Sequence, residues 1–388
     1  MKSILYFSLA DWFWIKQRPH HIPEILSKNN RVVYLCFSSW RGAKHLVNSN
    51  LSEQKYFKRS HFKVNKNLIV IRKKILPPKN MGLLNIAYKP AKSFFDRHIK
   101  RDIKKLDSTN KFDILILTSP NQISFFTDDL LSGKFIIYDC MDDYKEFGGT
   151  YTEEFVANES RLINVSKRII VSSEQLYKKL LRYGSDIANK IVVINNAVDT
   201  RSFDYQREFE DVHIGYLNDA EKKVAYIGTV AKWVDLELIL HMALKHKDIK
   251  FYIIGPVSRG IDLRKYEDVE NMVFVGVQPY EFIPAILKRV DVSIMPFKKI
   301  ELVKSVNPVK IYESLAMGKP VIATRYEETE KFGDLIFTYE TEDEFEKILV
   351  DLVNKKESES IINKRIEFAK ENSWDRRVEE IEKLWKDF

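Results

Sequence analysis

The chain has 388 residues, of which 45% are hydrophobic and 12% aromatic, and its formal net charge is +8 at pH 7. This composition excludes a disordered or fibrous protein, and the length is too great for one ordinary domain, so we expect two domains, each with its own core. No apolar run approaches the roughly 18–20 residues of a transmembrane helix, and the start MKSILYFSLADWFW lacks the long apolar stretch and cleavage site of a signal peptide, which predicts a cytoplasmic protein.

Short β-branched runs alternate with longer helical patterns along nearly the whole chain, which indicates parallel α/β architecture. Two sheets are more natural than one sheet of this many strands. The expected strands are residues 4–8, 31–37, 67–72, 112–119, 134–140, 168–173 and 191–195, and then 223–228, 251–255, 272–276, 292–297, 320–324 and 335–339.

The loop from Asp11 to Arg18 follows the first expected strand and precedes a helix, so we expect it at the carboxyl edge of a sheet, where such domains bind ligands. Trp12 and Trp14 are candidates for stacking on the rings of a ligand, sugar rings if the family resemblance given below holds, and Arg18 for holding a phosphate at the helix amino end. His20 is one of two adjacent histidines, of which at most one can face the ligand. Core packing or helix capping is the alternative role for these aromatic and histidine side chains.

The segment from Arg41 to Lys111 carries 19 Lys and Arg residues against four acids, a net +15, so the rest of the chain is net acidic. Such a concentration predicts an anionic partner surface, and we expect an anionic membrane or an acceptor phosphate. The alternative is an ordinary solvated surface. Part of the segment, MGLLNIAYKPAKSFFDRHIKR, has apolar and basic faces at helical spacing, interrupted at Pro90. The protein is therefore expected to associate peripherally with the inner face of a membrane.

Cys36 and Cys140 lie inside separate apolar strand-like runs and form no closely spaced pair. We expect buried thiols in a reducing compartment rather than a disulfide or a metal site.

The stretch YDCMDDY, residues 138–144, follows an expected strand into its carboxyl-end loop. Asp139, Asp142 and Asp143 are candidates for a general base or for binding acceptor hydroxyls. Capping of the next helix is the alternative. A metal site is disfavoured, because no histidine or further carboxylate cluster accompanies them.

A second candidate site is SVNPVKIYESLAMGKPVIAT, residues 305–324. Pro308 suits the first position of a short helix over 308–317, Asn307 or Ser305 can cap it, and Gly318 ends it. The helix amino end lies just after a strand, and its unpaired N–H groups make it an anion site.

Lys310 stands in the first turn of that helix, where the helix dipole disfavours a cation unless an anion bridges the two. A phosphate would remove this conflict. Glu313 follows three residues later, and its carboxylate can accept hydrogen bonds from the vicinal hydroxyls of a ribose. A surface salt bridge is the alternative role for Glu313.

These motifs resemble those of the group-1 glycosyltransferases of GT-B fold. The stretch 305–324 resembles their nucleotide-sugar-binding segment, residues 192–203 (VVINNAVDTRSF) their interdomain motif, and residues 224–240 (VAYIGTVAKWVDLELIL) the start of their second domain. QRPHHIPEIL and YDCMDDY are similar to sequences of a bacterial subgroup that builds surface polysaccharides, including teichuronic-acid-type transferases.

The resemblance implies a GT-B fold of two doubly wound Rossmann-like domains that face each other across a cleft. We expect an acceptor-binding domain over residues 1–200, a nucleotide-sugar-binding domain over 201–370, and a C-terminal helix over 371–388 that packs back toward the first domain. The boundary is expected in the polar stretch 195–223.

The resemblance also implies roles for individual residues. Glu313 corresponds to the family's ribose contact, and Lys310 is expected to stabilise the leaving diphosphate. The donor site is expected to comprise Gly228, Thr229, Lys232, Ser305, Asn307, Pro308, Val309, Lys310 and Glu313. The acceptor side is expected to comprise Trp12, Trp14, Arg18, His20 and Asp139.

The chain departs from the family at three positions. The first of the family's two glutamates falls on Ser305, and its paired Arg and Lys fall on Thr229 and Val234. Lys232 and Lys310 are the nearest cations that could replace that pair.

We therefore expect a metal-independent hexosyltransferase-type enzyme that moves a sugar from a nucleotide-sugar, with UDP as the expected nucleotide, to a lipid-linked or polysaccharide acceptor. The resemblance favours retention of anomeric configuration without an enzymic base; in an inverting enzyme, Asp142 or Asp143 would be the base. No cofactor is expected beyond the nucleotide-sugar co-substrate.

The alternative is a non-catalytic two-domain protein that binds nucleotide-sugars or glycans. An NAD-dependent enzyme is disfavoured because no G-x-G-x-x-G follows an early strand, and nucleic-acid binding because no recognised module is present.

Overall fold

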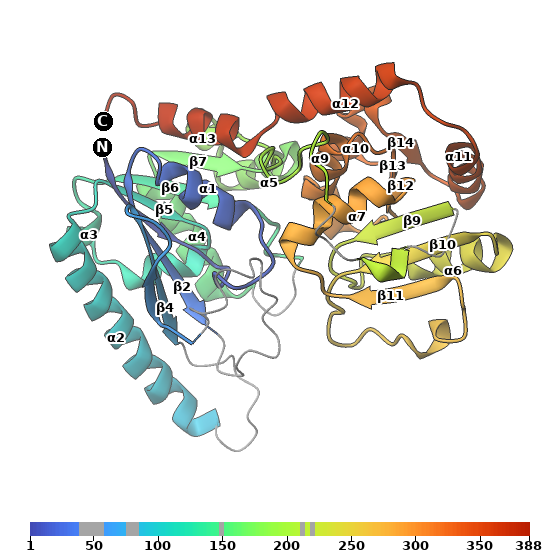
Figure 1. Ribbon diagram of the computed structural model, residues 1–388. Coiled ribbons are helices and arrows are strands. Elements are labelled where there is room, and N and C mark those ends of the chain that lie inside the picture. The colour runs from blue at the N-terminus through green and yellow to red at the C-terminus, as the bar shows by residue number, and fades with distance from the viewer. Residues whose placement is uncertain (39–57, 75–84, 147–150, 210–213, 218–221) are drawn as a thin grey trace. The chain divides into compact units, whose positions relative to one another are not determined.

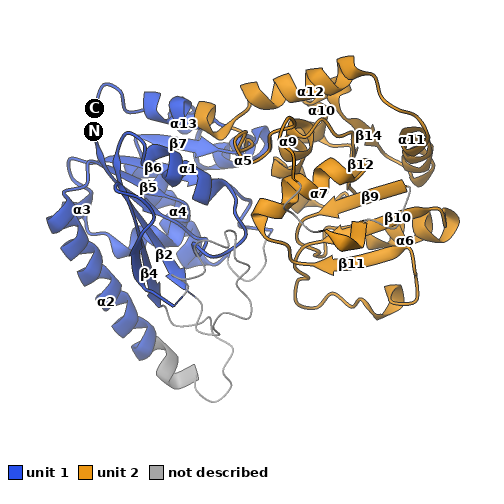
Figure 2. Ribbon diagram, in the orientation of Figure 1, with its two compact units in different colours: residues 1–194, 378–388 blue, residues 195–377 orange. Residues whose placement is uncertain are grey.

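The protein is described by a computed structural model, which covers residues 1–38, 58–74, 85–146, 151–209, 214–217 and 222–388 (Figure 1). The chain forms two compact units (Figure 2). Unit 1 comprises Met1–Ile194 with Val378–Phe388, and unit 2 comprises Asn195–Arg377. The domain limits expected from the sequence, 1–200, 201–370 and 371–388, stay a prediction.

Unit 1 is an α/β unit built on an eight-stranded sheet. Its strands are β1 (Ser3–Phe7), β2 (Arg31–Ser38), β3 (His61–Lys63), β4 (Leu68–Lys74), β5 (Ile114–Leu117), β6 (Phe135–Cys140), β7 (Arg168–Val171) and β8 (Ile191–Val193). Its helices are α1 (Arg18–Leu26), α2 (Asn85–Asn110), α3 (Asp128–Leu131), α4 (Glu153–Val165) and α5 (Glu174–Leu180), together with the 3-10 turn η4 (Pro120–Phe125).

The strand order of this sheet is β3-β4-β2-β1-β5-β6-β7-β8, and every pairing is parallel except that of β3 with β4. The order reverses at β1, which lies between β2 and β5. In such sheets the loops diverge at the carboxyl ends of the strands beside the reversal, and ligands bind there. The loops after β1 and β5 are therefore the natural binding edge of unit 1.

Unit 2 is built on a six-stranded, wholly parallel sheet with the order β11-β10-β9-β12-β13-β14. Its strands are β9 (Lys222–Ile227), β10 (Ile249–Ile254), β11 (Met272–Gly276), β12 (Val292–Met295), β13 (Val321–Thr324) and β14 (Phe337–Tyr339). Its helices are α6 (Leu236–Lys245), α7 (Ile283–Arg289), α8 (Glu301–Lys304), α9 (Val309–Ala316), α10 (Glu327–Glu330), α11 (Glu342–Asn354) and α12 (Glu359–Glu371). Helix α13 (Trp374–Lys383) begins in unit 2 and ends in unit 1.

Alternate residues of the central strand β9 enter two different hydrophobic clusters of unit 2. Val224 and Tyr226 pack in one cluster, and Ala225 and Ile227 pack in the other. Successive side chains of a strand point to opposite faces, so both faces of this sheet are covered. This explains why the strands read as continuous apolar runs rather than as alternating patterns.

Each of the thirteen strands expected from the sequence overlaps a strand of the structure, and the expectation of two sheets is confirmed. Strand β3 was not expected, because its three residues, HFK, are too few to show a period. Helix α2 contains Pro90 near its amino end, so the expected interruption there is wrong. Beyond Pro90 the helix packs Ile99 and Ile103 into the core of unit 1, which holds it in one piece.

Cys36 and Cys140 are both buried and free, as the sequence predicted. Burial raises the pKa of each thiol well above its ordinary value, so neither is a reactive thiolate at neutral pH. Within the described ranges, no helix combines the length and the apolar character needed to cross a membrane.

Candidate functional site

Helix α9 begins at Val309, with Pro308 as its N-cap in an extended conformation. The sequence predicted Pro308 as the first helical residue, and this detail is wrong, because the helix begins one residue later. Pro308 itself makes no side-chain cap hydrogen bond, and the side chain of Asn307, one of the two expected caps, bonds to Asn196 and Glu328 instead. Capping by Ser305 stays a prediction. The first backbone N–H groups of α9 have no partner within the helix itself.

Gly318 ends this helix, as the sequence predicted. It adopts φ +67°, and a Cβ there would lie 2.8 Å from a side-chain carbon of Ile362. The N–H of Lys319 donates to the carbonyl of Ser314 at 2.9 Å, which closes the last turn. The chain can then enter β13 at once.

Glu313 is 1% exposed and forms an ion pair with Lys310, whose Nζ donates to Oε2 at 2.7 Å. Burial raises the pKa of Glu313 above its ordinary value, Lys310 lowers it, and Asp199 raises it. The second carboxylate oxygen, Oε1, is buried and accepts no hydrogen bond from any residue that the structure describes. A buried acceptor without a hydrogen bond costs about 1–3 kcal/mol, and more when the group is charged. This oxygen is therefore suited to a hydroxyl donor from a ligand.

Asn307 ties the start of α9 to the segment where unit 2 begins. Its Oδ1 accepts from the backbone N–H of Asn196 at 2.8 Å, and its carbonyl accepts from the side chain of Asn196 at 2.6 Å. Its Nδ2 donates to Glu328 at 2.8 Å, and Glu328 is fully buried and paired with Lys331. These bonds explain why Asn307 does not cap the helix.

Asn196 and Glu328 were missed as site-supporting residues. The only sequence signal for Asn196 was the Asn-Asn pair in NNAVD. Its hydrogen-bond partner, Asn307, lies 111 residues away.

The loop after β9 contains the other expected donor-site residues of unit 2. Gly228 and Thr229 are partly exposed, and Lys232 is exposed. Gly228 also meets Gly255, because a Cβ on Gly255, which has φ +145°, would lie 2.0 Å from the carbonyl oxygen of Gly228. The loop thus depends on a close approach that only glycine permits.

Val234 and Ser305, two positions where the chain departs from the family pattern, are both 2% exposed. Val234 packs in the hydrophobic cluster that contains α6 residues, and Ser305 follows α8 as its C-cap. Val309 is partly exposed at the first turn of α9. The roles of Ser305 and Val309 in binding a donor stay predictions.

In unit 1, Arg18 and Asp139 pair with each other rather than standing open to a ligand. Nη2 of Arg18 lies 2.9 Å from Oδ1 of Asp139, its Nε donates to the same oxygen at 3.1 Å, and its Nη1 donates to the carbonyl of Ile194 at 2.8 Å. Arg18 is 3% exposed and Asp139 is 1% exposed. Because a buried charge needs a partner, the two residues stabilise each other as a buried ion pair. The expected phosphate role of Arg18 and the expected acceptor or base role of Asp139 stay predictions.

Trp12 is 1% exposed, and its ring meets Tyr34 edge-on with 4.8 Å between ring centroids. This packing is the alternative role that the sequence left open for Trp12, and the expected stacking on a sugar stays a prediction. Trp14 is partly exposed, so its expected role stays a prediction.

His20 is also 1% exposed, and burial lowers its pKa to about 4. Its Nδ1 accepts from the N–H of Gln17 at 3.3 Å, and Nε2 lies 3.1 Å from the carbonyl of Asp11. The ring is therefore neutral, donates from Nε2, and fixes the first turn of α1, which is the capping role that the sequence offered as the alternative. The expected acceptor role of His20 stays a prediction.

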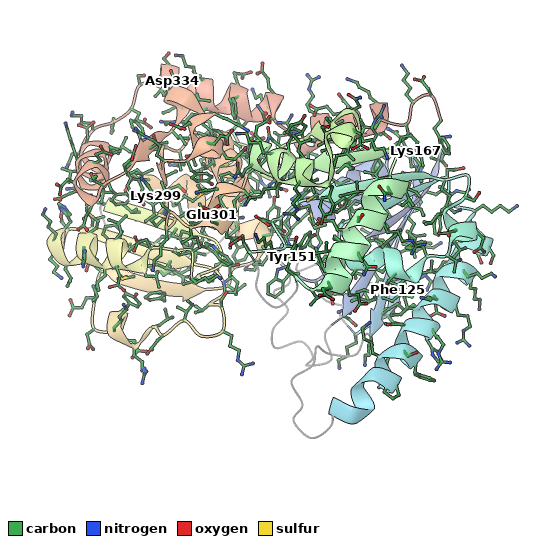
Figure 3. The ribbon with its side chains drawn as sticks, turned by 180° about the vertical axis from the view of Figure 1, so that it is seen from behind. Phe125, Tyr151, Lys167, Lys299, Glu301 and Asp334 are labelled. Carbon is green, nitrogen blue, oxygen red and sulfur yellow. The ribbon has the colours of Figure 1, made fainter. Side chains whose placement is uncertain are left out.

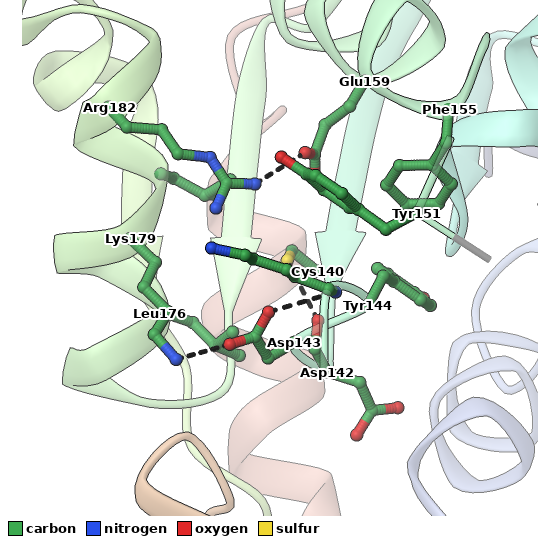
Figure 4. Close-up of a pocket in the computed structure, with 12 residues that line it drawn as sticks. Cys140, Asp142, Asp143, Tyr144, Tyr151, Phe155, Glu159, Leu176, Lys179 and Arg182 are labelled. Atoms are coloured by element: carbon green, nitrogen blue, oxygen red, sulfur yellow. Dashed lines mark hydrogen bonds and ion pairs between the residues drawn. The ribbon is translucent and has the colours of Figure 1, made fainter. Parts of the chain in front are cut away.

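A pocket lies at the carboxyl ends of β6 and β7 in unit 1 (Figure 4). It is lined by Cys140, Asp142, Asp143, Tyr144, Lys145, Tyr151, Phe155, Glu159, Leu176, Lys179, Leu180 and Arg182. Most of its charged groups pair within the pocket. Asp143 pairs with Lys179, and Glu159 pairs with Arg182 at 3.1 Å.

Asp142 differs from its neighbours. Its carboxylate points away from the Asp143–Lys179 pair (Figure 4), and no hydrogen bond or ion pair holds it within the described residues. Burial raises its pKa to about 6, helped by the negative charges of Asp139 and Asp143 and opposed by Arg18. Asp142 is therefore available to exchange a proton near neutral pH.

The described residues contain no group of three or more His, Cys, Asp or Glu side chains that could hold a metal ion. Lys310, Lys232 and the amino end of α9 are the positive groups that the expected donor site offers.

Comparisons with known proteins agree with this architecture. Residues 221–355 match the family model described as glycosyl transferases group 1. The putative teichuronic acid biosynthesis glycosyltransferase TuaH of Bacillus subtilis is 27% identical over 207 residues, which are 50% of this chain and 52% of TuaH. The match therefore spans about half the length of this curated relative.

Solved structures resemble the chain over its full length. The crystal structure of Anabaena HepE in complex with UDP-glucose has a TM-score of 0.69 at 12% identity and covers 100% of both chains. Sucrose-phosphate synthase from Thermosynechococcus elongatus has a TM-score of 0.71 at 13% identity and covers 100% of this chain and 99% of the synthase. These likenesses confirm the predicted fold class. The chain therefore has the GT-B fold, its residues 221–355 match the group-1 glycosyltransferase family, and it is distantly similar to TuaH.

Proposed function

We propose that this protein transfers a sugar from a UDP-sugar to a lipid-linked or polysaccharide acceptor in the synthesis of a bacterial cell-surface glycan. The observation that carries the proposal is Glu313, a buried carboxylate on α9 with one oxygen paired to Lys310 and the other without a donor. The similarity of the segment to the group-1 family supports the assignment.

On the donor side, Glu313 accepts the hydroxyls of the nucleotide ribose. Its Oε1 needs a donor, and vicinal hydroxyls supply two. Lys310 pairs with Glu313 and is 29% exposed at its side chain, so its ammonium can also contact a diphosphate beside the amino end of α9. Uridine as the base is supported by HepE, a structure of similar fold that was solved with UDP and with UDP-glucose.

The hard step is departure of the nucleotide diphosphate from the anomeric carbon, because negative charge grows on the β-phosphate. Donors fixed in place before the reaction stabilise that charge most effectively. Lys310, Lys232 and the α9 amino end perform this role, and no metal ion is needed. The transfer retains anomeric configuration without an enzymic base.

The acceptor binds unit 1, and the enzyme acts at the inner face of the cytoplasmic membrane. The name of TuaH, a putative teichuronic acid biosynthesis glycosyltransferase, supports a cell-surface polysaccharide as the product. The basic segment Arg41–Lys111 supports an anionic surface as the place of action; residues 39–57 and 75–84 of it lie outside the described residues.

A panel of nucleotides and nucleotide-sugars in a thermal-shift assay tests the donor. A ligand that binds only the folded state raises the unfolding midpoint by mass action. UDP and one UDP-sugar are expected to give the largest shifts, and the stabilising UDP-sugar is then tested for turnover. Equal shifts with ADP, GDP and UDP, or none, would remove the proposed donor.

A non-catalytic nucleotide-sugar-binding protein is the second candidate. It is favoured by Val234 and Ser305, which stand buried where the family keeps charged residues. Intact UDP-sugar binding with no hydrolysis or transfer for any sugar in the panel would support it and exclude the enzyme.

A further inference from the structure

One side of α2 presents cations that carry no described ion pair. Helix α2 runs along the outside of unit 1 (Figure 1), and side chains project from its outer side (Figure 3). The cationic face of α2 is defined here as Phe94, Arg97, Lys100, Arg101, Lys104 and Lys105, all exposed. Residues three and four apart lie above one another on a helix, so these positions form one continuous surface.

The opposite side of α2 is fixed to unit 1. Ile99 and Ile103 are 3% and 1% exposed and belong to its hydrophobic core. The orientation of the helix is therefore determined, and the cationic face points outward.

The acids of α2 do not neutralise that face, because each pairs with another lysine. Asp96 pairs with Lys92 at 3.1 Å, Asp102 with Lys73 at 2.6 Å, and Asp107 with Lys134 at 2.7 Å. The positive charge of the face is thus uncompensated by its own helix.

Phe94 distinguishes this surface from a merely charged one. It is 53% exposed, and its ring lies 4.1 Å from the ring of His98 between centroids. An apolar ring within a cationic helix face suits the boundary between lipid headgroups and acyl chains. The cations would also attract a nucleic acid, but Phe94 is the one exposed aromatic side chain of the described part of this helix, which provides neither a groove-reading element nor a series of stacking platforms.

We infer that the cationic face of α2 docks the protein on an anionic lipid bilayer, with Phe94 entering the headgroup layer. The charge is complementary to such a surface, and each cation near it strengthens binding by roughly fivefold. The chain outside Arg41–Lys111 is net acidic, so the attraction also orients the protein. This inference deepens the proposed location at a membrane and is independent of the donor chemistry.

Vesicle co-sedimentation of the full chain tests it. The vesicles are phosphatidylcholine alone or with about 30 mol % phosphatidylglycerol, in about 0.1 M salt. The variants are Arg101→Glu with Lys105→Glu, and separately Phe94→Ser. The matched control is Lys247→Glu with Lys356→Glu, which makes the same change of charge at exposed positions of unit 2.

The native protein and the control are expected to bind anionic vesicles only, and the double α2 variant to bind at least about tenfold more weakly. Phe94→Ser should weaken binding severalfold and leave its salt dependence unchanged. Equal binding to both vesicle types, or native binding by the double α2 variant, would overturn the inference. So would α2-dependent binding to duplex RNA or to a soluble acidic polysaccharide without binding to vesicles.

UDP binding is measured on the same proteins to separate the two proposals. The double α2 variant should keep the native unfolding midpoint and the native UDP affinity, which shows that it is folded. A native protein that binds anionic vesicles but not UDP would refute the proposed donor and leave the docking face standing.

Discussion

Lys310 and Glu313 lie three residues apart on α9 and form an ion pair of 2.7 Å, in which the lysine is partly exposed and the glutamate is buried. The pair explains why a cation stands in the first turn of a helix, where the dipole disfavours it. Lys310 offsets the cost of burying a carboxylate, and that carboxylate keeps one oxygen without a donor. The donor site thus presents Lys310 and an unsatisfied carboxyl oxygen before any ligand arrives.

Lys310→Met should weaken UDP binding by roughly tenfold or more, because it removes a charge-assisted contact to phosphate. It also removes the charge that lowers the pKa of Glu313, so that pKa rises further. The loss should therefore be greater at pH 6 than at pH 8. Calorimetric titration at both pH values checks this, with the exposed Lys347→Met on α11 as control. UDP affinity equal to that of the control at both pH values would contradict the assignment.

Glu313→Gln should stabilise the protein at neutral pH. Burial raises the pKa of Glu313 in the folded state, so folding binds its proton more tightly than the unfolded chain does. The stability that protonated Glu313 gives the native protein is fully present below the pKa that Glu313 has in the unfolded chain. It is lost as the pH rises through the pKa that Glu313 has in the folded protein. The free energy of unfolding of the variant relative to the native protein should therefore increase from about pH 4 to pH 7. A difference that is constant or falls over this range, measured by urea unfolding, would mean that the carboxylate is not strained by burial.

Much of the architecture follows from local pattern. The expected strands, the two sheets and the end of α9 at Gly318 rest on apolar runs and on glycine, which act over a few residues. The unit 1 site could not be predicted in this way. Arg18 and Asp139 are 121 residues apart and neutralise each other only because the loop after β1 and the end of β6 meet.

The same limit applies to other residues. The loop position of Trp12 suggests a surface for stacking on a ligand, but the local sequence does not reveal the packing against Tyr34 on β2 that buries its ring. Asn307 looks like a helix cap, and its bonds to Asn196 and Glu328 depend on segments that the local sequence does not reveal. Lys310 and Glu313 were found because helical spacing alone brings them together.

Breaking the Arg18–Asp139 pair should cost stability. Arg18→Met or Asp139→Asn leaves a buried group without its partner, and each is expected to lower the free energy of unfolding by about 3–5 kcal/mol. The double variant Arg18→Met with Asp139→Leu should lose less than the sum of the single variants. Urea unfolding measures this cycle. A single variant with native stability but no activity would instead support the binding and catalytic roles expected from the sequence.

Asp142→Asn should keep turnover within about tenfold of native in the retaining mechanism, since no enzymic base takes part. NMR of the freshly formed product should show retained anomeric configuration. An inverted product, together with a rate that falls below pH about 6 in the native enzyme and is lost in the variant, would make Asp142 the base. The sign follows from chemistry, because a base acts only when it is ionised and so fails below its pKa.

The most direct test of the donor site is calorimetric titration of UDP into the native protein and into Glu313→Gln. The substitution keeps the size of the side chain and removes the charge that the ribose hydroxyls would meet, so the affinity should fall by about 10- to 100-fold, while the exposed control Glu371→Gln binds as the native protein does. UDP binding of equal strength in all three proteins would contradict the account that Glu313 holds the nucleotide.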